Sequence, residues 1–242
     1  MFTGSKKAHI LNIPAAKYCK YCSNVTCSIS HILLGCPISR RAQIRRHDSI
    51  CRQMYYAIYR KHQQHDNNVW PTYIPKCTRI EDQNITILYN KEVLPRSTGK
   101  YPKRPDLYVE FGQDLAYIFD VSIVSDAKVR ETYSTKVNKY KELSQMLFSE
   151  KGIKKALIIP VIISTSGLVS RHTIQRLREL EINIKWPPII RELIIHQMKD
   201  IMFYLNQQID NAEVEPVNSP NSDYHQTHSG DVSLDEIIRY PS

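Results

Sequence analysis

Two apolar segments separated by three turn-forming residues constrain the fold of this 242-residue chain more than any other feature. Residues 107–111 and 115–124 are rich in β-branched and aromatic side chains, and Gly112, Gln113 and Asp114 lie between them. This pattern is typical of a β-hairpin with a three-residue loop. If the turn is centred on Gln113, residues 107, 109 and 111 lie opposite residues 119, 117 and 115. All six side chains then share one apolar surface.

The same register places Asp106 directly opposite Asp120 on the other surface of the hairpin. Cross-strand side chains approach to about 5 Å between Cβ atoms, and like charges at that separation destabilise a sheet. Two such carboxylates share a proton or bind a divalent cation, and Mg²⁺ prefers hard oxygen ligands. The sequence therefore predicts a metal-binding carboxylate pair. The alternative is two solvated carboxylates in a different register.

A helix is predicted over residues 126–150, and a lysine falls on its apolar side. At 100° per residue, Lys136 lies about 20° from Val129, in the middle of the apolar stripe. Lys139 falls toward the edge of the stripe, and Tyr140 lies one turn beyond Lys136. A lysine directed at the core needs an anion, which the carboxylate–metal site or a phosphate would supply. The alternative is that its ammonium group extends to solvent.

Another helix is predicted over residues 38–65, starting near Ser39, and an acid lies on its apolar side. The stripe consists of Ile44, Cys51, Tyr55 and Ile58. Asp48 lies within about 40° of Ile44, whereas Arg46 points away. Asp48 is either a third acid near the metal or a residue hydrogen-bonded within the core, and the sequence leaves both interpretations open.

Four potential zinc ligands precede this helix with the spacing C-x2-C-x8-H-x4-C. They are Cys19, Cys22, His31 and Cys36. Zinc prefers four tetrahedral nitrogen or sulfur ligands, and a Cys-x-x-Cys turn presents two thiolates together. With four protein ligands the site would be closed and structural; Cys27 is a spare thiol that could replace one of them. The alternative is a group of free cysteines beside an unrelated histidine.

The charge of the chain is unevenly distributed. The net charge is +9, but residues 211–242 contain six acids and one base, which leaves an excess of 14 positive charges in residues 1–210. A body this basic favours a polyanion such as nucleic acid, and a highly charged solvated surface is the alternative. The 7 glycines are too widely spaced for dinucleotide-binding, Walker A or Gly-x-Ser-x-Gly motifs. We also expect no membrane span and no secretion signal.

The last part of the core alternates strand and helix patterns. Residues 155–164 are predicted to form a buried strand, in which Pro160 favours an edge position or a bulge. An amphipathic helix follows over residues 168–182, and Pro188 is expected to begin a final helix.

Taken together, these motifs resemble the restriction-enzyme-like endonuclease domain of site-specific non-LTR (LINE-type) retrotransposons. That family has a CCHC zinc finger, an Arg-His-Asp element, a Pro-Asp pair followed by a second Asp, and a Lys-x-x-x-Tyr element. The finger matches the four zinc ligands named above. The other elements match Arg46-His47-Asp48, then Pro105-Asp106 with Asp120, and finally Lys136 with Tyr140.

The resemblance implies a PD-(D/E)xK restriction-endonuclease-like core, which is a mixed α/β fold with a mixed sheet flanked by helices. It implies a hydrolase that nicks DNA with Mg²⁺ (or Mn²⁺) to prime reverse transcription. Asp106 and Asp120 would bind the metal, and Lys136 would hold or activate the attacking water. Tyr140 would orient that lysine or the phosphate. The usual lysine, two residues after the second acid, is Ser122 here, so Lys136 must replace it and Lys139 is a rival.

We therefore expect a zinc-finger segment over residues 1–37, an endonuclease domain over 38–208 and an acidic, disordered tail over 209–242. The auxiliary or DNA-contacting positions are Arg46, His47, Asp48, Lys100, Lys103, Arg104 and Lys139. Partners would be double-stranded target DNA and, by the resemblance, the element RNA and the reverse-transcriptase domain of the same polyprotein. The protein would act in the nucleus after cytoplasmic synthesis. Alternatives are a non-catalytic zinc-finger nucleic-acid-binding module and a resolvase-like nuclease specific for branched DNA.

Overall fold

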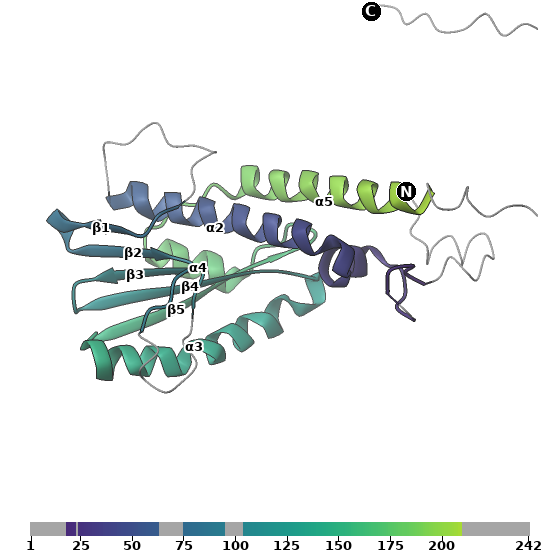
Figure 1. The fold of residues 1–242 in the computed structure, drawn as a ribbon. Helices are drawn as coiled ribbons and strands as arrows, with labels where there is room; N and C mark the ends of the chain where they lie inside the picture. Colours follow the sequence, from purple (N-terminus) through teal and green to yellow (C-terminus); the bar gives the residue numbers. More distant parts are fainter. Residues whose placement is uncertain (1–17, 23, 63–74, 95–103, 210–242) are drawn as a thin grey trace, which may run out of the picture.

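A five-stranded sheet lies between two layers of helices in the computed structural model (Figure 1). The structure describes residues 18–22, 24–62, 75–94 and 104–209. The chain is thus a mixed α/β protein with a mixed sheet flanked by helices, as predicted at that level. Lys100, Lys103 and the tail from residue 210 onward lie outside the described residues.

The strands follow one another across the sheet in sequence order. They are β1 (Thr78–Ile80), β2 (Ile85–Tyr89), β3 (Leu107–Phe111), β4 (Leu115–Val124) and β5 (Lys155–Ser164). The first four pair antiparallel, whereas β5 pairs parallel to β4. Parallel pairing needs a long crossover, which the helix between β4 and β5 provides. Because β5 is an edge strand, Pro160 occupies the kind of position predicted for it.

The hairpin has the register predicted from its sequence. Leu107 pairs with Phe119, Val109 with Tyr117 and Phe111 with Leu115, so the loop contains residues 112–114. Gly112 adopts a φ of 55°, in the left-handed region that glycine enters without a steric penalty. Asp106 lies one residue before the first of these pairs, and Asp120 lies one residue after the last position of β4 that pairs with β3.

Helices cover both faces of the sheet. On one face lie α2 (Arg40–His62), α4 (Arg171–Glu179) and α5 (Trp186–Ile209), with α2 and α5 side by side (Figure 1). The other face is covered by α3 (Val129–Lys151), which buries Tyr140, Leu143 and Leu147 against Tyr108 and Ile118. The two apolar cores explain why both surfaces of the hairpin are apolar, and they leave the acids at the ends of the paired region.

The start of α2 differs from its predicted orientation. Cys51, Tyr55 and Ile58 are buried as expected, but Ile44 is exposed and Arg46 is only 2 % exposed. The prediction that Arg46 points away from the interior is therefore wrong. The physical reason is a counter-ion on α5: Asp200 forms an ion pair with Arg46 and thereby rotates this side of α2 toward α5.

The cysteine-rich segment packs against the C-terminal half of α5. Tyr18 forms an isolated β-bridge with Thr26, and a single π-helical turn covers His31–Gly35. Tyr204 of α5 contacts this segment through its ring, which lies edge-to-face with Tyr21, and through its hydroxyl group, 3.4 Å from the Cys27 thiol. The segment therefore shares a small core with the main domain.

Candidate active site and candidate zinc site

Asp106 is positioned by two elements that are distant in the sequence. The backbone N–H of Val121 in β4 donates to Asp106 Oδ2 at 2.6 Å. The Nε2 atom of His47 in α2 lies 3.2 Å from the same oxygen. Both hydrogen-bond contacts of the Asp106 carboxylate thus involve Oδ2, and Oδ1 has no hydrogen-bond partner among the described residues.

His47 connects two carboxylates. Its Nδ1 atom lies 3.1 Å from Asp48 Oδ1, and its Nε2 atom faces Asp106. Burial by itself lowers the pKa of His47, but the hydrogen bonds to Asp106 and Asp48 and their negative charges outweigh burial and raise the pKa to about 9. Asp48 is half-exposed and contacts the imidazole that faces Asp106, so it lies in the same side-chain network as Asp106.

Asp120 is the most enclosed of the three acids, being only 3 % exposed. Its Oδ2 atom forms an ion pair with Lys136, and its Oδ1 atom lies 2.9 Å from Lys139 Nζ. The hydroxyl group of Tyr140 donates to Oδ1. Burial raises the pKa of Asp120, but the charge of Lys136 and these hydrogen bonds outweigh it and lower the pKa below its usual value.

The two rival lysines both reach the same carboxylate. Lys136 is 22 % exposed and Lys139 is 46 % exposed. The anion required by a lysine on the apolar side of this helix is therefore Asp120, which confirms the need for a counter-ion inferred from the helical periodicity. Lys139 Nζ also donates to the Tyr140 hydroxyl at 2.8 Å and lies 4.5 Å from the centre of its ring.

Tyr140 is fully buried beneath these charges. Burial and the neighbouring charge of Asp120 raise the pKa of its hydroxyl group well above the usual value, so Tyr140 is a hydrogen-bond donor at neutral pH. The hydroxyl group also lies 3.4 Å from the backbone carbonyl of Arg104, whose side chain is exposed. Tyr140 therefore connects α3, β4 and the segment that leads into Asp106.

Arg46 has a structural position rather than one that can contact DNA. Its guanidinium is buried, forms an ion pair with Asp200 and donates to the Leu33 carbonyl. Arg45, which is exposed, lies 2.9 Å from the same carboxylate. A buried, paired guanidinium is not available to a phosphate, so this prediction for Arg46 is corrected. Asp200 was missed because only the tertiary structure places α5 beside α2.

A cavity of about 480 Å³ is lined by His47, Asp48 and Lys136, which contact one another or the two hairpin acids, whereas Asp106 and Asp120 themselves do not line it. It is bordered by the first turns of α2, the end of β4 and Lys136. The polar and charged side chains along it include Arg40, Gln43, His47, Asp48, Ser122 and Lys136. Basic groups and the carboxylate of Asp48 thus line the same cavity.

The four predicted zinc ligands converge, with their donor atoms all within 4.8 Å of one another. Cys36 Sγ lies 3.8 Å from Cys19 Sγ and 3.9 Å from Cys22 Sγ. The Nε2 atom of His31 is buried and has no hydrogen-bond partner among the described residues. These side chains could hold a metal ion such as zinc, whose preferred ligands are thiolates and imidazoles.

The protein environment favours a thiolate at Cys19. Although burial raises its pKa, hydrogen bonds from the Tyr204 hydroxyl at 3.1 Å and from the backbone of Tyr21 lower the pKa to about 7. Burial raises the pKa of Cys36 to about 12, so a cation would be required to hold all three cysteines as thiolates together. Cys27 interacts with Tyr204 and lies outside this group of four.

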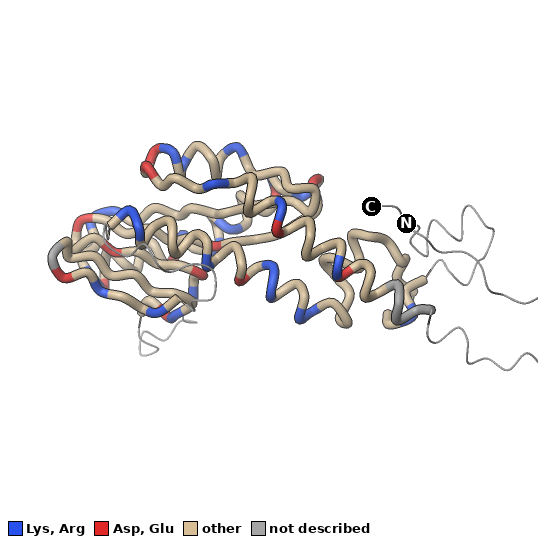
Figure 2. The backbone as a smooth tube through the Cα atoms, turned by 90° about the horizontal axis from the view of Figure 1, so that it is seen from above, with Lys and Arg blue, Asp and Glu red and all other residues tan. Residues whose placement is uncertain are grey.

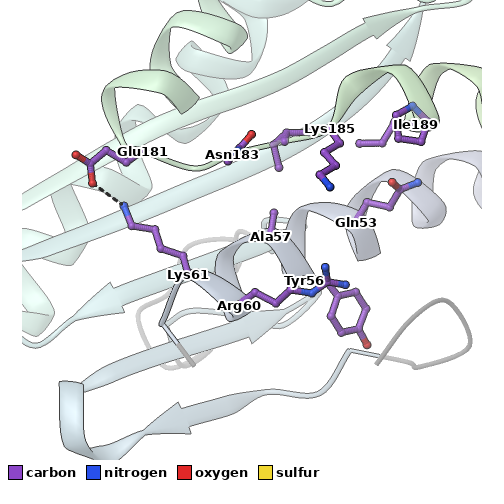
Figure 3. A pocket seen from close by; sticks show the side chains of 11 residues that line it. Gln53, Tyr56, Ala57, Arg60, Lys61, Glu181, Asn183, Lys185 and Ile189 are labelled. Atoms are coloured by element: carbon purple, nitrogen blue, oxygen red, sulfur yellow. Dashed lines mark ion pairs between the residues drawn. The ribbon is translucent and has the colours of Figure 1, made fainter. Parts of the chain in front are cut away.

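A larger cavity, of about 750 Å³, separates the second half of α2 from the segment that leads into α5 (Figure 3). Its walls include Tyr56, Arg60 and Lys185, together with Lys61, which forms an ion pair with Glu181 at 3.6 Å. None of Asp48, Asp106, Asp120 and the four candidate zinc ligands lines it.

The chain matches no model of a known protein family, and it matches no curated protein sequence. Within the described ranges, no helix is both long enough and apolar enough to cross a lipid bilayer.

Proposed function

We propose that this protein is a Mg²⁺-dependent DNA endonuclease of the kind that its motifs resemble, with Asp106 and Asp120 at its active site. One observation carries the proposal. The two acids flank the Leu107–Phe119 pair of one hairpin, and the N–H of Val121, the residue after Asp120, donates to Asp106. Helix α2 supplies His47 to Asp106, and α3 supplies Lys136, Lys139 and Tyr140 to Asp120. Such a concentration of ionisable groups beside a cavity is more characteristic of a reactive site than of a structural ion pair.

The residues present fit a hard divalent cation. Asp106 offers Oδ1, and Asp120 carries a full negative charge because its pKa is lowered. Lys136, Lys139 and Tyr140 engage both oxygens of Asp120, so a bound Mg²⁺ would replace an ammonium group as the counter-ion of this carboxylate. When bound there, Mg²⁺ would lower the pKa of a bound water and neutralise charge on the scissile phosphate.

The protein groups would perform the remaining steps. Lys136 would hold the attacking water or neutralise a phosphoryl oxygen, because its ammonium group lies at the edge of the cavity. Tyr140 would keep Asp120 and Lys139 in place through its hydroxyl group. His47, held by Asp48, would orient Asp106 so that Oδ1 faces the ligand.

Other features are consistent with a nucleic-acid substrate. Lys and Arg are distributed along the whole described chain (Figure 2), and residues 1–210 carry an excess of 14 positive charges. A metal-binding finger of the type proposed here would add a second contact to the duplex. By the resemblance, the biological substrate is double-stranded target DNA, nicked in the nucleus to prime reverse transcription of the element RNA.

The test compares Asp106→Ala with Asp114→Ala on supercoiled plasmid, with and without Mg²⁺. Asp114 is a matched control because it is an exposed carboxylate on the same hairpin. We expect Asp106→Ala to bind DNA normally and to nick it about 100- to 1000-fold more slowly, since metal-assisted stabilisation is worth several kcal/mol. Equal nicking rates for the two variants would refute the site.

The same assay separates the rival functions. A non-catalytic zinc-finger module would bind DNA in EDTA and never nick it. A resolvase-like nuclease would cleave a four-way junction faster than a linear duplex of the same sequence.

A further inference from the structure

We propose that His47, Cys51 and Asp106 form a binding site for a soft divalent transition-metal ion such as Zn²⁺, distinct from the cysteine-rich site. The three donor atoms lie within 4.8 Å of one another. Two come from the same face of α2, because residues four apart on a helix are neighbours. Asp106 approaches from the start of β3.

The distances are close to those of a coordinated ion. On a tetrahedral zinc ion with bonds of about 2.0–2.3 Å, ligand atoms lie roughly 3.3–3.6 Å apart. His47 Nε2 lies 3.2 Å from Asp106 Oδ2, and Cys51 Sγ lies 3.8 Å from His47 Nε2. A small rotation of the imidazole about χ2, a torsion with a broad energy minimum, would direct Nε2 between the other two donors.

The surroundings of the histidine are those of a metal ligand. Its Nδ1 atom lies 3.1 Å from Asp48 Oδ1, and a carboxylate at this position holds the ring so that the other nitrogen can bind a metal. His47 and Asp48 both border the cavity of about 480 Å³, which provides an access route from solvent. With three protein ligands, the fourth coordination position would take a water molecule.

The electrostatic field supports a cation at this position. Burial raises the pKa of the Cys51 thiol well above its usual value, and the charges of Asp106, Asp48 and Asp120 raise it further. The negative charges of Asp106 and Asp48 attract a divalent ion, and coordination would release two protons to solvent, one from the Cys51 thiol and one from His47 Nε2. A thiolate and an imidazole favour Zn²⁺, Co²⁺ or Cd²⁺ over Mg²⁺, which prefers oxygen ligands.

This site has a consequence that rests on the proposed function. Asp106 cannot serve a Mg²⁺ ion fully while it coordinates a zinc ion, so excess Zn²⁺ would inhibit nicking. The inhibition would depend on Cys51, which takes no part in the proposed catalysis.

The binding test uses the full chain, loaded with one equivalent of zinc and titrated with Co²⁺. The variants are Cys51→Ala and, as a matched control, Cys77→Ala, which removes an exposed thiol. We expect the wild type and Cys77→Ala to bind one more Co²⁺ than Cys51→Ala does, with a thiolate-to-cobalt absorption band that Cys51→Ala lacks. His47→Gln should lose the band as well. This second variant keeps the proposal testable if Cys51→Ala does not fold.

The inference is overturned if the wild type binds no further Co²⁺, or if Cys51→Ala and His47→Gln retain the band. The activity test follows plasmid nicking in Mg²⁺ with added Zn²⁺, where Cys51→Ala should tolerate at least about 10-fold more Zn²⁺ than Cys77→Ala. If the protein never nicks DNA but shows the Cys51-dependent band, the proposed nuclease function is refuted and the proposed metal site is supported.

Discussion

The Nε2 atom of His47 lies 3.2 Å from Asp106 Oδ2, and this contact joins two residues that are 59 positions apart in the chain. It connects the helix over one face of the sheet to the end of the hairpin. The imidazole thereby sets the direction of the carboxylate that the proposed chemistry uses. A contact of this kind makes the stability of the protein depend on the protonation of one histidine.

The stability contribution of His47 should disappear at alkaline pH. Because the pKa of His47 is raised from 6.5 to about 9 in the folded state, its contribution is complete below about pH 6.5 and is lost as the pH rises through about 9. Urea unfolding of the wild type at several pH values should show this loss. His47→Gln should show a smaller loss over the same window, whereas His172→Gln, at an exposed histidine, should behave as the wild type. Parallel profiles for all three proteins would contradict the prediction.

The two lysines on Asp120 should differ in importance for nicking. Lys136 is the more enclosed and is the largest favourable influence on the charge of Asp120. We expect Lys136→Met to slow single-turnover nicking by about 100- to 1000-fold and Lys139→Met by about 10-fold or less. Methionine keeps most of the apolar stem, so the comparison isolates the ammonium group. A larger effect at Lys139 would reverse the assignment.

Removing Arg46 should destabilise the fold strongly. Arg46→Ala leaves the buried carboxylate of Asp200 without its enclosed partner, and breaking a buried pair costs about 3–5 kcal/mol. The control is Arg45→Ala, which removes an exposed partner of the same carboxylate and should cost less than about 1 kcal/mol. Urea denaturation gives both values. Similar free energies of unfolding for the two variants would show that burial of Arg46 contributes little.

The cysteine-rich segment should depend on metal. We expect Cys22→Ser to lose one equivalent of zinc, and chelation of the wild type to lower its melting temperature, because the metal would hold three thiolates and His31 together. Cys27→Ala, in the same segment, should keep its zinc because Cys27 contacts Tyr204 instead. Metal analysis after dialysis measures both. If Cys27→Ala lost its zinc while Cys22→Ser kept it, Cys27 would replace Cys22 among the metal ligands.

The hairpin loop should reject a side chain at Gly112. Gly112→Ala combines an unfavourable positive φ with a Cβ atom 2.8 Å from Asn84 Nδ2. Gly152→Ala has a similar φ, but its Cβ would meet nothing within 4 Å. The Gly152 variant should lose about 1 kcal/mol of unfolding free energy and the Gly112 variant more. Equal losses would mean that Asn84 moves aside without cost.

Local patterns were sufficient for the hairpin and for the bounds of most elements. The register of β3 and β4 followed from one glycine-containing turn and the apolar alternation around it, because a shift by one residue would expose the whole apolar set. An edge position was one of the two possibilities predicted for Pro160, and β5 is the last strand of the described sheet, where no second neighbouring strand requires the N–H donor that proline lacks. The short strand β1 was not predicted, since three residues carry too little pattern.

Those local patterns could not predict which side chains that are distant in the sequence contact each other. Arg46 was expected at the surface because nothing near it in the sequence shows that Asp200 lies beside it. Cys51 was assigned only to the apolar stripe, although its spacing of four from His47 is a signal for shared ligation on a helix.

By itself, then, the sequence determined the hairpin, the approximate helices, and the spacing of the candidate zinc ligands, because each depends on neighbours along the chain. Only the tertiary structure decided that both Lys136 and Lys139 reach Asp120, that His47 rather than Asp48 contacts Asp106, and that Arg46 is buried. The physical reason is that a charged side chain adopts the position of its nearest opposite charge. That partner is chosen by how the helices pack on the sheet, which no local pattern records.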